Sequence, residues 1–230
     1  MKTTKNALLL ALSIALLATA SPAAAQADFS KFVAIGASVD AGFLDNCWVR
    51  YGQVDSWNAI LARQAGAPAF EQPLLDTPGT GCMYLISLAP QFGTRPAQVK
   101  PLNLNLPRPY DNLSIPGYTL QTALTKKGPS SATDVAGIVL RTLNATQVEQ
   151  AASLKPTFVS IGLFGNEILG PATSGTAVDG VTVMPAAAYA ASYQAVVNAL
   201  KAAQGGTGKG VAQLIPDITT IPFPSTIPPF

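Results

Sequence analysis

The residues of this chain that could do chemistry are one serine, one glycine and one asparagine, each in a short turn-like motif. Ser38 lies in Gly-Ala-Ser-Val, Gly117 ends Leu-Ser-Ile-Pro-Gly, and Asn166 lies in Phe-Gly-Asn-Glu. A serine hydroxyl is a nucleophile for acyl transfer, and a backbone N–H or an amide side chain can donate to the oxyanion that forms. Each motif also has an ordinary alternative role, because Ser, Gly and Asn are common turn residues.

The segment before each motif has the composition of a short strand. Strand patterns cover residues 31–37, 111–117, 157–163 and 210–215, and helical patterns cover about 55–65, 119–124, 132–143, 144–154 and 186–203, with a small-residue loop at 171–180. Strands that alternate with helices predict an α/β fold with a parallel sheet and helices on both faces. Because the carboxyl ends of parallel strands meet at one edge, the three motifs are expected to converge there.

Residues 67–109 are the least regular part of the chain and contain eight prolines. This composition predicts a long excursion over the sheet edge, without long helices or central strands. Loops of that length in a compact domain are usually functional or mobile. Tyr84, Phe92 and Tyr110 could give the excursion an apolar binding surface, and packing beneath the loop is the alternative interpretation.

Residues 1–27 have the three regions of a signal peptide. Basic residues stand near the start, an apolar run covers 7–20, and small residues at 25–27 fit a cleavage site. The apolar run is shorter than the roughly 20 residues that a membrane-spanning helix needs. We therefore expect a secreted or periplasmic protein with one domain at residues 28–230 and no transmembrane segment after cleavage.

Charge and composition exclude several classes of partner and cofactor. Residues 1–27 hold two of the 14 basic residues and none of the 12 acidic ones, so the remaining chain is close to neutral. Nucleic acid is therefore not an expected partner. The chain has no histidine and few carboxylates, so neither a metal nor another cofactor is expected. A dinucleotide site of the short-chain dehydrogenase kind is also disfavoured, since only Gly36 and Gly42 stand where that motif needs three glycines.

The two cysteines, Cys47 and Cys82, both lie in loop-like sequence. In an oxidising compartment such a pair could form a disulfide. Two free buried thiols are the alternative, and the sequence leaves both open.

Together the motifs make the chain resemble the SGNH hydrolases, also called GDSL esterases and lipases, over residues 32–224. Residues 36–39 resemble the Gly-Asp-Ser-Leu block of that family, and residues 112–117 resemble the block that supplies a glycine. Residues 164–167 resemble its Gly-x-Asn-Asp block. The chain departs from these blocks in having Ala37, Phe164 and Glu167.

The resemblance implies a three-layer α/β/α, flavodoxin-like fold with a parallel sheet, C-terminally incomplete in this chain. It implies that Ser38 is the nucleophile. It also implies an oxyanion hole made of the backbone N–H groups of Ser38 and Gly117 and the side chain of Asn166. The substrate would be a small-molecule or lipid carboxylic ester, and the reaction would need no cofactor.

The fourth block of the family, Asp-x-x-His, has no counterpart because the chain contains no histidine. A serine protease without one triad member keeps only about 10³–10⁴-fold catalysis over water. We therefore expect a serine esterase or lipase that is inactive or nearly so. Two interpretations stay open: a truncated esterase, which the abrupt stop after residues 216–217 favours, and a non-catalytic secreted relative that binds a ligand.

Overall fold

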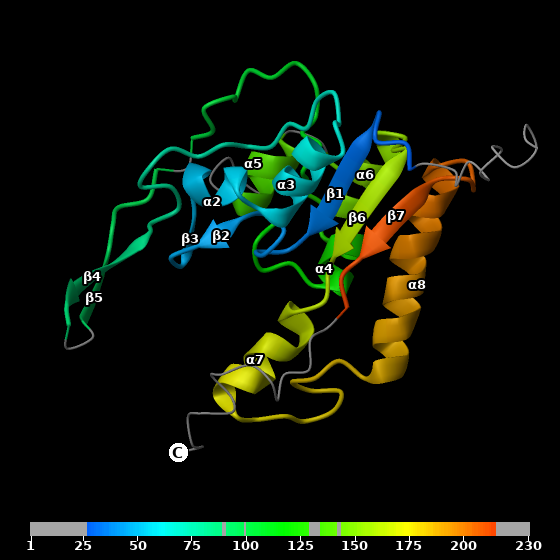
Figure 1. Cartoon of the computed structure of the whole chain (residues 1–230). Coiled ribbons are helices and arrows are strands. Elements are labelled where there is room, and N and C mark those ends of the chain that lie inside the picture. Colours follow the sequence, from blue (N-terminus) through cyan, green and yellow to red (C-terminus); the bar gives the residue numbers. More distant parts are fainter. Residues whose placement is uncertain (1–26, 89–90, 99, 129–133, 142–143, 215–230) are drawn as a thin grey trace, which may run out of the picture.

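The structure, a computed structural model, describes residues 27–88, 91–98, 100–128, 134–141 and 144–214 (Figure 1). Residues 1–26, which make up nearly all of the predicted signal peptide, and residues 215–230 lie outside the described residues. Within those ranges, no helix is both long enough and apolar enough to span a membrane.

Three parallel strands form the central sheet in the order β1-β6-β7. They are β1 (Phe32–Gly36), β6 (Phe158–Gly162) and β7 (Lys209–Ala212). All residues of β1 and β6 are buried, which explains why both have mostly apolar sequences rather than an alternating pattern. The strands predicted at 31–37 and 157–163 are confirmed. The outer strand, β7, is exposed along its whole length.

Residues 111–115 add a fourth parallel segment on the other side of β1. The N–H of Ala34 donates to the carbonyl of Asp111 over 2.9 Å, and the N–H of Leu113 donates to the carbonyl of Ala34 over 2.8 Å. The N–H of Ile115 donates to the carbonyl of Gly36 over 3.0 Å. Strand β1 therefore has parallel backbone on both sides, β6 on one and residues 111–115 on the other.

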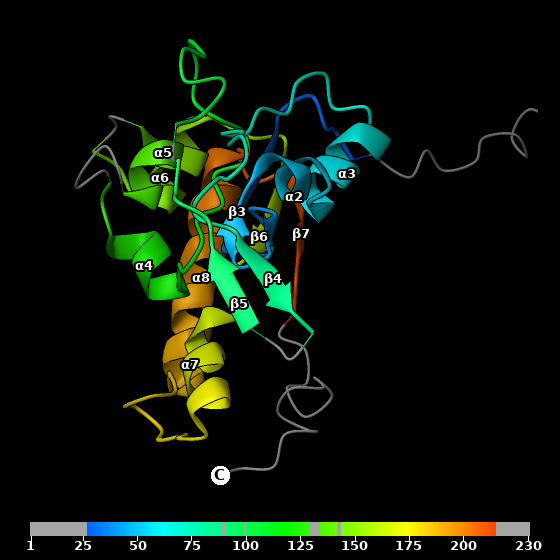
Figure 2. The same ribbon diagram turned by 90° about the vertical axis from the view of Figure 1, so that its left-hand side faces the viewer.

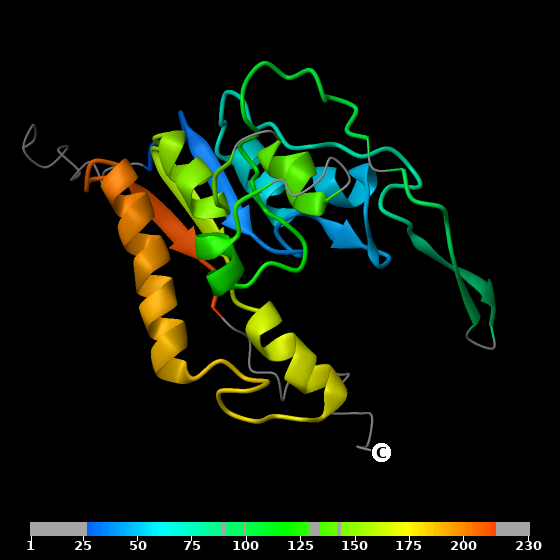
Figure 3. The ribbon, with the colours of Figure 1, turned by 180° about the vertical axis from the view of Figure 1, so that it is seen from behind.

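Helices cover both faces of the sheet, as Figures 1 and 3 show from opposite sides. One face carries α3 (Trp57–Gln64), whose Ala62 packs with Phe32 and Phe158 at the amino ends of the strands. The other face carries a helical layer: α4 (Leu120–Thr125), α5 (Val135–Leu140), α6 (Gln147–Ser153) and α8 (Ala186–Ala203). The predicted α/β class is confirmed.

Side-chain caps fix the starts of three helices. The Ser56 hydroxyl accepts a hydrogen bond from the N–H of Ala59, so Ser56 is the cap of α3. Thr119 and Thr146 form reciprocal capping boxes at α4 and α6. These local signals explain why the sequence located the starts of α3, α4 and α6 to within three residues.

The described part of residues 67–109 has no long helix and no strand of the central sheet, as expected, and it contains a β-hairpin that its composition did not predict. Its strands are β4 (Met83–Ser87) and β5 (Gln91–Thr94), and Figure 2 shows them in front of the rest of the molecule. Proline excludes central strands of a sheet, but it leaves room for two short antiparallel strands that pair only with each other. The hairpin is joined at its base to β3 (Cys47–Trp48) by a disulfide between Cys47 and Cys82. A shorter strand, β2 (Phe43–Leu44), pairs with β3, and α2 (Arg50–Val54) follows.

The prediction of a loop at residues 171–180 is wrong over its first part. Helix α7 (Asn166–Ser174) continues through Pro171 and ends at Gly175, which has a left-handed φ of 69°. Proline removes one hydrogen bond from a helix. The carbonyl that loses its helical donor is that of Glu167, four residues before Pro171, and the helix continues without this bond.

We expect the double variant Cys47→Ala/Cys82→Ala to unfold more easily than the parent. The bridge closes a sequence separation of 35 residues, and in the chain-entropy account a loop of that size is worth about 4 kcal/mol. Urea unfolding followed by circular dichroism measures the difference. A reducing agent should lower the midpoint of the parent and leave that of the variant unchanged; equal midpoints for the two proteins would contradict the expected stabilisation.

Candidate active site

Ser38 lies two residues beyond the carboxyl end of β1, in a tight turn. The N–H of Ala41 donates to the carbonyl of Ala37 over 3.0 Å, and the N–H of Phe43 donates to the carbonyl of Ser38 over 2.8 Å. The Ser38 side chain is partly exposed. Within the described part of the chain it has no hydrogen-bond partner, so no base is in place to take its proton.

Gly117 follows the parallel segment beside β1 and needs the conformation that it has. Its φ is 83°, and a Cβ at this position would meet nothing within 4 Å. L-residues rarely adopt such a φ, so the turn, rather than crowding, accounts for a glycine here. The exposed backbone of Gly117 leaves its N–H accessible to a ligand.

Asn166 begins α7, just beyond the carboxyl end of β6. Its Nδ2 donates to the carbonyl of Tyr118 over 2.7 Å, which holds the side chain beside the residue that follows Gly117. An amide nitrogen carries two hydrogens, so one N–H remains for a ligand.

The structure therefore brings the three predicted residues to the same edge of the sheet. Gly36 is in register with Gly162 across β1 and β6. On the other side Gly36 accepts the hydrogen bond from Ile115, two residues before Gly117. Neighbouring strands lie about 4.8 Å apart, so Ser38 leaves the sheet between the segments that end at Gly117 and Asn166.

Gln147 on α6 also orders this edge, and sequence reasoning missed it. Its buried Nε2 donates to the carbonyl of Gly36 over 2.9 Å and to that of Leu113 over 2.7 Å. One side chain thus ties the end of β1 to the adjacent parallel segment. Helix α6 has four polar residues among its seven, so its composition did not single out Gln147.

Asp40 is the second residue that sequence reasoning missed. Its side chain is fully buried, and its carboxylate accepts from Trp57 Nε1 over 3.0 Å and from the N–H of Ala37 over 3.4 Å. A Cβ on Gly36 or on Gly162 would lie within 2.2 Å of this carboxyl group. Both strands therefore have to end in glycine for Asp40 to fit between them.

Burial raises the pKa of the Asp40 carboxyl to about 7, although hydrogen bonds from its neighbours oppose the shift. A carboxyl group with this pKa is suited to general-base work near neutral pH. The donors around Asp40 come from Ala37, Trp57 and Asn58, and none of them is Ser38. We therefore assign Asp40 to holding the turn rather than to proton transfer.

Glu167 stands where the resemblance leads one to expect aspartate, and it contacts another helix rather than Ser38. Its Oε1 accepts a hydrogen bond from the N–H of Leu120 at the start of α4 over 2.5 Å. Its Oε2 is buried and has no partner within the described residues. Glu167 thus connects α7 to α4 and fixes the helix that presents Asn166.

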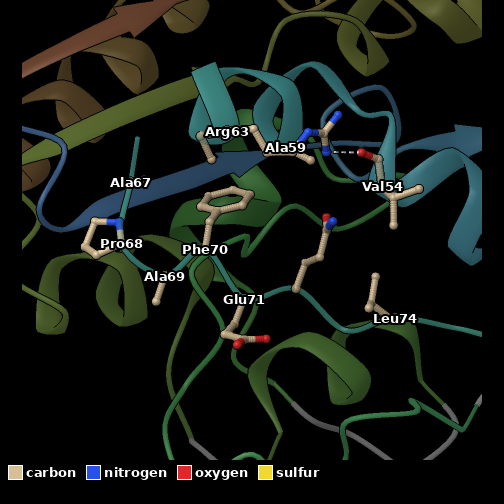
Figure 4. Close-up of a pocket in the computed structure, with 11 residues that line it drawn as sticks. Val54, Ala59, Arg63, Ala67, Pro68, Ala69, Phe70, Glu71 and Leu74 are labelled. Atoms are coloured by element: carbon tan, nitrogen blue, oxygen red, sulfur yellow. Dashed lines mark hydrogen bonds between the residues drawn. The ribbon is translucent and has the colours of Figure 1, made fainter. Parts of the chain in front are cut away.

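A pocket of about 300 Å³ lies between α3 and residues 67–74. Figure 4 shows the ring of Phe70 facing Ala59 and Arg63 of α3. None of the three predicted site residues lines the pocket. Of the aromatic residues expected to form a surface on the excursion, Tyr84 and Phe92 are exposed, whereas Tyr110 is buried.

The described residues contain no group of three Cys, Asp or Glu side chains that could hold a metal ion. Comparisons of this chain with protein-family models, with curated proteins and with solved structures found no match. The assignment of a function therefore rests on the geometry of the site.

We expect the stability of the parent to fall as the pH rises from about 4 to about 7. In the unfolded chain Asp40 ionises near pH 3.8, whereas in the folded chain its pKa is raised to about 7. The unfolded state therefore binds fewer protons over this interval, which costs the folded state roughly 4 kcal/mol. Asp40→Asn resembles the protonated form and removes this cost. Its stability relative to the parent should increase between pH 4 and pH 7 and stay constant above pH 7.

Urea unfolding of both proteins at several pH values measures this difference. Asp55→Asn is the matched control, because the carboxylate of Asp55 is exposed. A difference between Asp40→Asn and the parent that is the same at pH 4 and pH 8 would contradict the raised pKa.

Proposed function

We propose that the edge formed by Ser38, Gly117 and Asn166 binds carboxylic esters in the manner of an SGNH/GDSL serine esterase. Ester hydrolysis through Ser38 is at most slow in this chain. The observation that carries the proposal is the common edge at which β1, β6 and residues 111–115 end. Three residues suited to acyl transfer leave the sheet there side by side.

Each residue has a distinct part in the proposed reaction. The Ser38 hydroxyl attacks the ester carbonyl, and the bond to the leaving alcohol breaks after the tetrahedral intermediate has formed. The backbone N–H groups of Ser38 and Gly117 and the remaining N–H of Asn166 donate to the oxyanion. Water then hydrolyses the acyl-serine and restores the hydroxyl. No histidine exists in the chain to accept the serine proton, so the first step is the slow one.

A second candidate function, binding of an ester or its acid without turnover, has its own support. The missing base removes the chemistry without removing the donors. The apolar pocket beside Phe70 offers the fold a separate place for a small ligand. A ligand-binding relative of the esterases would keep both features.

We expect the parent to release p-nitrophenol slowly from a short-chain p-nitrophenyl ester, and Ser38→Ala to lose this enzyme-dependent rate. Added imidazole should raise the rate of the parent above that of Ser38→Ala, because an external base can take the Ser38 proton. Imidazole cleaves such esters by itself, so the difference between the two proteins is the quantity to measure by absorbance. Ser153→Ala, which removes an exposed hydroxyl on α6, is the matched control.

Equal rates for the parent and Ser38→Ala, with and without imidazole, would exclude Ser38 as the nucleophile. Saturable binding of the ester with the same Kd in both proteins and no product release would favour the ligand-binding alternative.

A further inference from the structure

We propose that the β4–β5 hairpin docks the protein on an anionic lipid surface. The hairpin is remote in sequence from Ser38, and docking through it does not depend on the ester chemistry.

The hairpin projects from the body of the protein, as Figures 1 and 3 show from opposite sides. Its strands pair with each other and with no other strand of the described chain. An isolated two-stranded hairpin is marginally stable in water. Here the disulfide between Cys47 and Cys82 fixes its base, so that it can project without support from a larger sheet.

Several side chains along the hairpin are apolar and exposed. Leu85 and Phe92 are opposite each other across the two strands, and they are 53% and 57% exposed. Leu88 at the end of the hairpin is 95% exposed. Residues 83–94 contain no charged residue. A cluster of this kind on a projecting element is typical of an interaction site rather than of a solvent-facing surface.

Arg95 directly follows β5, and its cation is the charge next to this apolar end. Lys100 follows five residues later, whereas Arg108 is ion-paired with the buried carboxylate of Asp111 beside β1. The guanidinium of Arg95 lies over the ring of Tyr84, 5.0 Å from its centroid. Apolar residues at the tip with an aromatic ring and a cation behind them match the order of acyl chains and headgroups in a lipid monolayer.

Asp45 is an acidic residue that contacts the base of the hairpin. Its carboxylate accepts a hydrogen bond from the Tyr51 hydroxyl over 2.8 Å, and its carbonyl accepts from the N–H of Met83. Asp45 therefore lies at the base with Cys82 and not beside Leu85 or Phe92. The charge of Arg95 favours an anionic lipid surface over a second copy of this chain, because two copies that met through their hairpins would bring two Arg95 cations together.

We expect the parent to co-sediment with vesicles that contain phosphatidylglycerol and to bind phosphatidylcholine vesicles more weakly. Leu85→Ser/Phe92→Ser should lower the partition coefficient at least about tenfold, because the variant lacks the two apolar side chains that the lipid would bury. Arg95→Gln should lower it about fivefold on anionic vesicles, the effect of one cation near such a surface, and should change it little on neutral ones. Leu169→Ser/Val181→Ser, which removes two exposed apolar side chains elsewhere, should bind like the parent.

A probe within the hairpin distinguishes docking through this element from binding through another part of the full chain. In Phe92→Trp the added indole should shift its emission to shorter wavelength with anionic vesicles and be quenched by brominated acyl chains. An unchanged emission spectrum, or equal partitioning of the parent and Leu85→Ser/Phe92→Ser, would overturn the proposal. Self-association of the parent without lipid, abolished in Leu85→Ser/Phe92→Ser, would overturn it in favour of a dimer.

Discussion

The contact on which the edge of the sheet depends is the one between the Asp40 carboxyl group and the two glycines that end β1 and β6. The carboxyl occupies the space that side chains at Gly36 and Gly162 would fill. It also accepts hydrogen bonds from the turn that carries Ser38 and from α3. Burying a carboxyl is unfavourable unless it is hydrogen-bonded or protonated, and here both conditions contribute. The turn, two strand ends and one helix are thus fixed by a single side chain.

Further polar contacts extend this arrangement to the flanking segments. The Asn112 amide donates to the carbonyl of Asp40 over 3.1 Å, and the Ser160 hydroxyl donates to Asn58 over 2.7 Å. Gln147 closes the other side through its bonds to Gly36 and Leu113. Buried polar groups that satisfy one another specify one arrangement of the chain more strictly than apolar packing does. These hydrogen bonds hold the turn that carries Ser38 against the segment that ends at Gly117.

The two proposed properties lie in different parts of the molecule. The donors that we propose for ester binding lie at the carboxyl edge of the sheet, whereas the apolar surface that we propose for lipid docking lies on a hairpin held by a disulfide. The hairpin is connected to the body through Cys82 and the short strands before α2, so changes at its tip leave the packing of β1 and β6 untouched. The two properties can for this reason be altered one at a time.

The sequence by itself determined the α/β class, the strands β1 and β6, the approximate positions of α3, α4 and α6, and the turns that hold Ser38, Gly117 and Asn166. These features follow from local rules, namely apolar runs, cap side chains and glycine at positive φ. The tertiary structure alone decided that Asp40 and Gln147 order the edge, that Cys47 pairs with Cys82, and that an apolar hairpin projects from residues 67–109. Each of these depends on which distant segments meet, and neither periodicity nor composition of one segment specifies its partner.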